Sequence, residues 1–201
     1  MIDMQSLRPA ITNWVWLAEM SGMHDALVIG DCPLFVRAGI EQHFSAITHH
    51  PVGKVPGQTG VHLAGISLPF EGGSFDCVLV DEQIGETSFR GERRDIIPLF
   101  HGIRHVLREG GCAFVPVPEL NRRGPGRLVR QIRKAGFRHV RVLYVYESLE
   151  RPNTLVPANR TTAAYFEMFA WGGLKGRVRA LIAAMGFHYL LHPAMLVLAF
   201  R

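Results

Sequence analysis

Short apolar runs alternate with segments of helical periodicity along most of this sequence. The runs lie at positions 26–29, 46–48, 60–63, 75–80, 112–117, 139–146 and 194–200. The fourth run is apolar nearly throughout, as expected for a strand that is buried on both faces of a sheet. Strands separated by helices are typical of β–α–β units, so the pattern predicts an α/β fold with a parallel sheet.

Helical spacing of apolar residues fills the gaps between these runs. The clearest case is the segment 96–107, in which Leu99, Phe100 and Ile103 fall on one helix face. Further helices are predicted at 11–20, 126–135, 161–171 and 174–185. Glycines at 110–111, 136 and 186 follow predicted helices and are expected to end them. Residues 148–160 are rich in proline and asparagine, so we expect a long connection there.

The length of 201 residues suits one domain that buries its core without disulfide bonds or metals. We expect residues 1–201 to form this single domain, with residues 1–24 as a helical lead-in. Residues 148–171 would be an insertion between the last two strands. Such an insertion would shape an acceptor pocket or an interface.

Cysteine usage and hydropathy indicate a cytoplasmic protein. Cys32, Cys77 and Cys112 lie in or beside apolar runs without C-x-x-C spacing, which is typical of free buried thiols in a reducing compartment. The start of the chain lacks the basic and apolar regions of a signal peptide. The apolar stretch 180–200 has the length of a membrane span, but histidines, a glycine and a proline interrupt it, so we expect no transmembrane span.

Positive charge is concentrated in the segment 122–141, which holds eight lysines and arginines and no acid. A solvated helix face accounts for such a segment, and a docking face for an acidic protein, a nucleic acid or anionic lipid is the alternative. Only Phe137 interleaves with these charges, which disfavours binding of single-stranded nucleic acid.

Three motifs in order give the sequence a family resemblance. They are L-P-F-E-G-G-S-F-D at 68–76, V-L-R-E-G-G at 106–111 and A-G-F at 135–137. The sequence resembles the class I S-adenosylmethionine (SAM)-dependent methyltransferases, in particular their small-molecule and natural-product branch. The resemblance implies a Rossmann-like fold: a mostly parallel seven-stranded sheet with an antiparallel last strand and helices on both faces. It also implies SAM as cofactor and a small molecule, glycan or peptide as acceptor in a bacterial biosynthetic pathway.

The cofactor positions implied by this resemblance are Gly30, Asp31, Cys32, His49 and Ala64. Members of the family have a glycine loop after the first strand, where the backbone approaches the cofactor. In this chain Gly30 is kept, whereas Cys32 and Leu34 replace the other glycines. The family also has an acid at the end of the second strand, where a carboxylate accepts both ribose hydroxyls. Here that position falls near His49 or His50.

A further acid of the family, after the third strand, falls at Ala64 in this chain. Two missing carboxylates and a filled loop therefore leave SAM binding in question.

The acids Asp81 and Glu82 come directly after the fourth predicted strand, at the sheet edge where α/β proteins place ligand and catalytic groups. Either acid, or His49 or His50, would serve as the base that takes a proton from the acceptor. The alternative is that Asp81 and Glu82 only cap the strand and begin a solvated turn.

Two hypotheses therefore stay open. The chain is either an active SAM-dependent methyltransferase or a catalytically inactive homologue that serves as a structural or regulatory partner subunit, with residues 122–141 as the contact. An N-P-P-Y-type motif, used on amino groups of bases, is absent at 80–83, so a nucleic-acid substrate is disfavoured. His101 and His105 have helical i, i+4 spacing but no third ligand nearby, so no metal site is expected.

Overall fold

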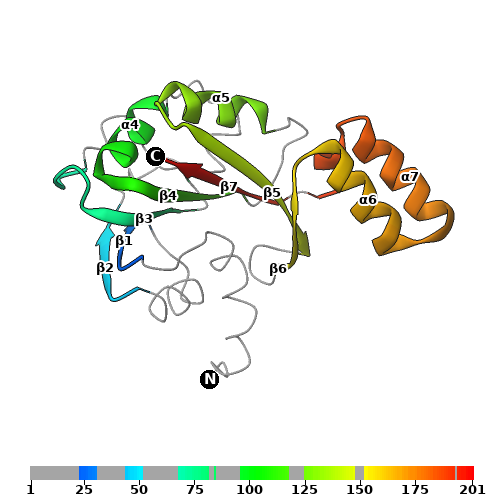
Figure 1. Cartoon of the computed structure of the whole chain (residues 1–201), viewed down its shortest axis with the longest axis horizontal. Coiled ribbons are helices and arrows are strands. Elements are labelled where there is room, and N and C mark those ends of the chain that lie inside the picture. The colour runs from blue at the N-terminus through cyan, green and yellow to red at the C-terminus, as the bar shows by residue number, and fades with distance from the viewer. Residues whose placement is uncertain are drawn as a thin grey trace, which may run out of the picture.

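The computed structural model describes residues 23–30, 44–51, 68–81, 84, 96–117, 125–147, 152–192 and 194–201. These residues form a seven-stranded sheet with the strand order β2-β1-β3-β4-β7-β5-β6 (Figure 1). The strands are β1 (Asp25–Ile29), β2 (Ala46–His50), β3 (Phe75–Val80), β4 (Leu107–Val117), β5 (His139–Glu147), β6 (Pro152–Pro157) and β7 (Met195–Phe200). The predicted helix 11–20 and the predicted strand 60–63 lie outside the described residues.

The sheet is mixed and mostly parallel. Strands β2, β1, β3 and β4 are parallel, and β7 lies antiparallel between β4 and β5. Strand β5 therefore has the same direction as β4. The last strand is antiparallel, as the resemblance implied. Because β7 is central, its side chains are buried on both faces, which explains its uninterrupted apolar sequence.

The predicted connection 148–160 is wrong over part of its length. Residues Pro152–Pro157 form the edge strand β6, which pairs antiparallel with β5. Proline lacks a donor for the sheet and is tolerated in strands mainly at an edge. The prolines led us to predict a connection here, but they are compatible with a strand at the edge of the sheet.

Two helices pack on one face of the sheet (Figure 1). Helix α4 (Ile97–Val106) and helix α5 (Gly126–Lys134) agree with the predicted segments. Leu99, Ile103, Leu128 and Ile132 from these helices join the core formed with β1, β3, β4 and β7. Among the described residues, α4 and α5 cover one face, so the expectation of helices on both faces is tested for that face only.

Gly110 and Gly111 do not directly follow helix α4, which ends at Val106. They lie inside β4, at an irregularity in its pairing with β3 between Phe75 and Cys77. A Cβ on Gly111 would lie 2.9 Å from two backbone oxygens, those of Arg108 and Asp76. Gly111 therefore allows the close approach of β4 to β3.

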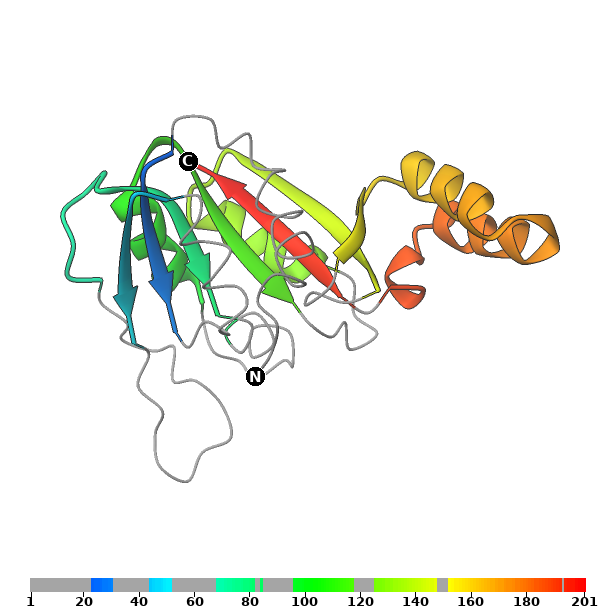
Figure 2. The same ribbon diagram turned by 90° about the horizontal axis from the view of Figure 1, so that it is seen from below.

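The chain between β6 and β7 forms a helical hairpin. Helix α6 (Arg160–Trp171) begins at Asn159, whose side chain accepts a hydrogen bond of 2.7 Å from the backbone N–H of Thr162. Helix α7 (Gly173–Ala184) and a short 3-10 helix, η2 (His188–Leu190), follow. Figures 1 and 2 show the hairpin projecting beyond the end of the sheet. The predicted helices 161–171 and 174–185 are confirmed.

Among the described residues, no helix combines the length and the apolarity that crossing a membrane requires. The apolar stretch 180–200 divides into the end of α7, η2 and strand β7.

Candidate functional site

The carboxyl ends of β1, β2 and β3 meet at one edge of the sheet. The backbone N–H of Gly30 donates to the carbonyl of His50 at 2.9 Å, and the N–H of Asp81 donates to the carbonyl of Ile29 at 2.9 Å. Two of the residues predicted from the sequence, Gly30 and Asp81, are thereby brought together. This edge is where open α/β sheets bind ligands.

Gly30 is in contact with Asp81. Its φ of 97° lies in the left-handed region, and a Cβ added there would be 2.4 Å from Cβ of Asp81 and 2.8 Å from its Oδ2. An L side chain at position 30 would meet both backbone strain and a clash. The glycine is therefore required by the close approach of the Asp81 side chain to the turn after β1.

The end of β2 offers two histidines that point to opposite faces of the sheet. His49 is exposed, and His50 is half-buried with its ring edge-on to Phe70 at a centroid distance of 5.9 Å. Phe70 in turn packs edge-on against Phe75. The ring of His50 is therefore engaged in packing on the face that carries α4, and His49 is the one of the two that is open to solvent.

The remaining predicted site residues lie outside the described part of the chain. These are Asp31, Cys32, Leu34, Ala64 and Glu82. Cys77 and Cys112 are described, and both are buried free thiols, as predicted. Burial raises the pKa of Cys77 well above its usual value and that of Cys112 to about 12, so neither thiol ionises at neutral pH.

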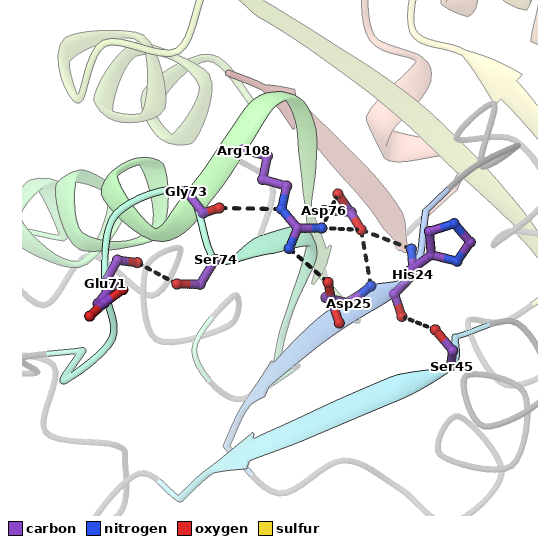
Figure 3. A network of polar contacts seen from close by, with 8 residues as sticks. All are labelled: His24, Asp25, Ser45, Glu71, Gly73, Ser74, Asp76 and Arg108. Carbon is purple, nitrogen blue, oxygen red and sulfur yellow. Dashed lines mark hydrogen bonds and ion pairs between the residues drawn. The ribbon is translucent and has the colours of Figure 1, made fainter.

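The opposite, amino edge of the sheet holds a polar network (Figure 3). Asp76 accepts hydrogen bonds from the backbone N–H groups of His24 at 2.8 Å and Asp25 at 3.0 Å. Arg108 donates to both carboxylate oxygens of Asp76 at 2.9 Å and lies 2.8 Å from the Asp25 carboxylate. Two of the motifs behind the family resemblance thus meet here, since Asp76 belongs to S-F-D and Arg108 to V-L-R.

This network stabilises the ionised form of Asp76. Partial burial raises the pKa of Asp76, but the hydrogen bonds from the backbone of Asp25 and His24 and from Arg108 outweigh it and hold the pKa below its usual value. The network lies at the edge remote from Gly30 and Asp81. It ties the starts of β1 and β3 to β4, which is a structural role.

A buried polar cluster in the hairpin was not found from the sequence. Glu167 of α6 is fully buried and accepts hydrogen bonds through Oε1 from Tyr146 at 3.0 Å, His188 at 2.9 Å and His192 at 2.5 Å. Its Oε2 accepts from Nε of Arg179 on α7 at 2.5 Å. We call these five residues the Glu167 cluster. One feature of the sequence could have indicated this cluster: Glu167 is the only acid in residues 152–192.

Hydrogen bonding keeps Glu167 ionised despite its burial. Burial raises its pKa, yet the donors Arg179, His192, His188 and Tyr146 lower it to about 2. Burial lowers the pKa of both histidines, and Glu167 only partly offsets this. At neutral pH the cluster therefore holds an ionised Glu167 paired with the Arg179 guanidinium, and both histidines are neutral.

The three potential metal ligands Glu167, His188 and His192 have donor atoms within 4.8 Å of one another. However, the Arg179 guanidinium already supplies a positive charge to Glu167, and its Nη2 lies 3.4 Å from Nε2 of His192. A divalent cation there would be repelled at short range by this guanidinium. The cluster is balanced in charge as an ion pair, and we assign it a structural role.

The predicted basic segment forms the outer face of α5 and the start of β5. Leu128 and Ile132 are buried, and all described lysines and arginines of the segment are exposed: Arg127, Arg130, Arg133, Lys134, Arg138 and Arg141. A cavity of about 610 Å³ between α5 and the β5–β6 end of the sheet is lined in part by Arg133 and Arg141. This arrangement fits the solvated helix face and leaves a docking role as a proposal.

The sequence matches no protein-family model and no curated protein sequence. Its structure is similar to that of a SAM-dependent methyltransferase from Archaeoglobus fulgidus, with a TM-score of 0.57 at 10% identity over 94% of this chain and 90% of that one. A SAM-dependent methyltransferase from Mesorhizobium loti gives 0.51 at 15% identity over 94% and 98%.

Phosphoethanolamine N-methyltransferase 2 from Haemonchus contortus, in complex with SAM, gives a TM-score of 0.52 at 14% identity. The match covers 94% of this chain and 52% of that larger one. At these identities the likeness concerns the fold, and at that level it confirms the resemblance drawn from the sequence motifs.

Proposed function

We propose that this chain, which has the fold of the class I SAM-dependent methyltransferases, is a SAM-dependent methyltransferase that acts on a small molecule, glycan or peptide in a bacterial biosynthetic pathway. The observation that carries the proposal is the turn at Gly30, with its left-handed φ and the Asp81 side chain against it. The turn lies at the carboxyl edge of β1 and β3, where this fold places its cofactor.

The turn after β1 supports SAM binding by its place at the carboxyl edge of the sheet. The Asp81 side chain fills the space that a Cβ of Gly30 would take, so a carboxylate lies directly beside this turn. When bound, SAM would supply the methyl group to be transferred. Asp81 would accept a hydrogen bond from the acceptor and hold the proton that the acceptor loses. From the sequence alone, we also propose Asp31, Cys32 and Ala64 as cofactor-binding positions and Glu82 as a second candidate for the base.

The end of β2 does not fit SAM in the way usual for the family, because neither His49 nor His50 carries a carboxylate. A neutral imidazole nitrogen accepts one hydroxyl proton where a carboxylate accepts two. A hydrogen bond to a charged group contributes about 1.5–3 kcal/mol. We therefore expect SAM to bind roughly ten- to a hundred-fold more weakly than it would with an acid at this position.

Titration calorimetry of the purified chain with SAM and with S-adenosylhomocysteine tests this proposal. We expect heat of binding at up to millimolar ligand, and a weaker heat for Asp81→Asn. The matched control is Glu71→Gln, which also neutralises one acid but lies in the loop that precedes β3, beside the polar network of the amino edge (Figure 3). Absence of any heat would overturn SAM binding, and an equal effect of both variants would remove Asp81 from the site.

A second candidate is a catalytically inactive homologue that acts as a partner subunit. It is favoured by the missing carboxylate at the end of β2 together with the exposed arginines of α5. The triple variant Arg127→Glu, Arg130→Glu, Arg133→Glu should then lose its partner while keeping its fold. Transfer of a labelled methyl group from SAM by the purified chain alone would count against this candidate.

A further inference from the structure

Large exposed apolar side chains gather on one part of the molecule. Every such side chain among the described residues lies between positions 165 and 190, in and directly after the α6–α7 hairpin. They are Tyr165, Met168, Phe169, Trp171, Leu174, Val178, Leu181, Met185, Phe187 and Leu190. Soluble monomers rarely expose apolar surface gathered in this way, and such a patch marks a site of interaction.

The spacing of these side chains shows that they face outward. On α7, Leu174, Val178, Leu181 and Met185 recur at i, i+4, i+7 and i+11, which is one stripe of a helix. The buried residues Gly176 and Ala183 are each two positions from members of this stripe, about 200° around the helix axis. The apolar stripe therefore lies opposite the side of α7 that packs in the hairpin.

Helix α6 repeats the arrangement. Its buried residues are Ala163 and Glu167, and the exposed rings of Tyr165 and Phe169 lie two positions away from them. These two rings stack at a centroid distance of 6.4 Å, and Phe169 is 75% exposed. Both helices thus turn aromatic or aliphatic side chains away from each other.

A buried ion pair lies inside the hairpin, and large apolar side chains lie on its outside. The Glu167 cluster joins α6 to α7 through the pair of Glu167 and Arg179, at 2.5 Å. The small core beside this pair holds Ala163 and Ala183 together with larger apolar side chains: Val156, Tyr146 and Phe166. Helices on the surface of soluble proteins carry mostly polar residues on the face away from the core, whereas α6 and α7 also place large apolar side chains there. This outer surface is suited to contact with an apolar medium.

The charge of the hairpin selects among possible partners. Arg160, Lys175 and Arg177 are exposed, and Glu167, the only acid of the segment, is buried. The Nζ of Lys175 lies 3.9 Å from the ring centre of Trp171, so a cation and an indole are held side by side. Basic and indole groups beside an apolar surface are typical of helices at the lipid headgroup level. Two copies of this chain would bring like charges together.

We propose that the α6–α7 hairpin docks the protein on an anionic lipid bilayer. The outward side chains of α6 and α7 enter the boundary between headgroups and acyl chains, and Lys175 and Arg177 contact the phosphates. The hairpin lies in the interface and does not cross the bilayer. This inference goes beyond the proposed function and does not depend on it.

Flotation of the full chain with vesicles tests the inference. We expect binding to vesicles of phosphatidylcholine mixed with phosphatidylserine, and much weaker binding to phosphatidylcholine alone. Leu181→Glu should weaken binding to the mixed vesicles at least about tenfold more than Thr161→Glu, because only the first removes a membrane-buried apolar group. Both variants add one negative charge to an exposed position of the same hairpin.

The double variant Lys175→Gln, Arg177→Gln should lose the preference for phosphatidylserine. Circular dichroism establishes that each variant keeps its helices. Failure of the wild-type chain to float with mixed vesicles overturns the proposal, as does an equal effect of Leu181→Glu and Thr161→Glu. Concentration-dependent dimerisation in light scattering that Leu181→Glu abolishes would identify a second copy as the occupant and also overturn it.

Discussion

Gly30 and Asp76 stand at opposite edges of the same central strands, and each is required for a different reason. Gly30 gives the turn after β1 a conformation that no other residue adopts without strain. Asp76 collects two backbone donors and one guanidinium at the start of β3. The Asp76 network thus joins strands at the amino edge, and Gly30 shapes the turn at the carboxyl edge, where the proposed ligand would bind.

Gly30→Ala is expected to destabilise the protein by more than about 2 kcal/mol. A left-handed conformation alone costs a non-glycine residue about 1–2 kcal/mol, and a steric clash adds to this cost. The clash arises because the new Cβ would lie 2.4 Å from that of Asp81. Gly110→Ala is the control, since Gly110 has a φ of 80° with nothing within 4 Å of an added Cβ. Urea unfolding of both variants measures the difference. Equal losses would contradict the close approach of Asp81.

Asp76→Asn is expected to destabilise the protein by about 1–3 kcal/mol, because an amide keeps only one acceptor oxygen for three donor groups. The pKa of Asp76 is lowered, so its contribution is complete above the usual value of 3.8 and is lost as the pH falls below it. Urea unfolding at neutral pH measures the loss. The exposed acid Glu71, changed to Gln, should leave the stability nearly unaltered, and a similar loss there would contradict the argument.

The helical hairpin is the element whose design differs most from that of a soluble domain. A buried carboxylate with four donors joins its helices, and large apolar side chains are exposed on its outer sides. A buried ion pair costs desolvation, so it is retained only where every partner is in place. The Glu167 cluster includes Tyr146 of β5 and two histidines that follow α7, so the cluster fixes the hairpin to the sheet.

The pH dependence of stability should report on this cluster. Burial lowers the pKa of His188 and His192 below 6.5, so their contribution is complete above 6.5 and decreases as the pH falls below it. Glu167, with its pKa lowered to about 2, loses its contribution only as the pH falls below 4.5 toward that value. Thermal unfolding at pH values from about 7.5 to 5 should show a decrease that is smaller in the variant His188→Gln, His192→Gln. If stability decreases with falling pH equally in the variant and in the wild-type chain, the two histidines do not cause the decrease.

Glu167→Gln should destabilise the protein by roughly 3–5 kcal/mol at neutral pH, because Arg179 would keep a charge without its counter-ion. The control Glu109→Gln changes an exposed acid of β4. Guanidinium unfolding followed by circular dichroism compares the two. A loss for Glu167→Gln no larger than that of the control would show that the cluster does not stabilise the hairpin.

At the scale of the whole molecule, the last strand in the sequence closes the centre of the sheet. Strand β7 pairs with both β4 and β5, and its residues from Met195 to Ala199 are buried. Within the described sheet, the strands β2-β1-β3-β4 and the strands β5-β6 are hydrogen-bonded to one another only through β7. The hairpin lies directly before it in the chain and outside the core. Apolar residues only a few positions apart therefore have opposite environments.

This contrast predicts that a glutamate will destabilise the protein strongly at one apolar position and hardly at all at another. Val197→Glu should abolish folding, at a cost above about 4 kcal/mol, because it buries a charge without a partner between Val115 and Val142. Leu181→Glu should change stability by about 0.5 kcal/mol or less, since Leu181 is 61% exposed. Circular dichroism and thermal unfolding of both variants check this. Unfolding of Leu181→Glu would show that the outer side of the hairpin is covered within the chain.

The sequence by itself determined the α/β class, most element bounds and the family of folds, because buried strands and amphipathic helices leave periodic patterns that depend only on local order. It also pointed to Gly30 and Asp81, which follow two such strands. The tertiary structure alone decided that Asp76 and Arg108 bind each other, that β6 is an edge strand and that Glu167 is buried among His188, His192 and Arg179. It also decided which apolar residues face outward. The pattern of residues 174–185 predicts a helix, but only packing shows that Leu174, Val178 and Leu181 lie away from the core.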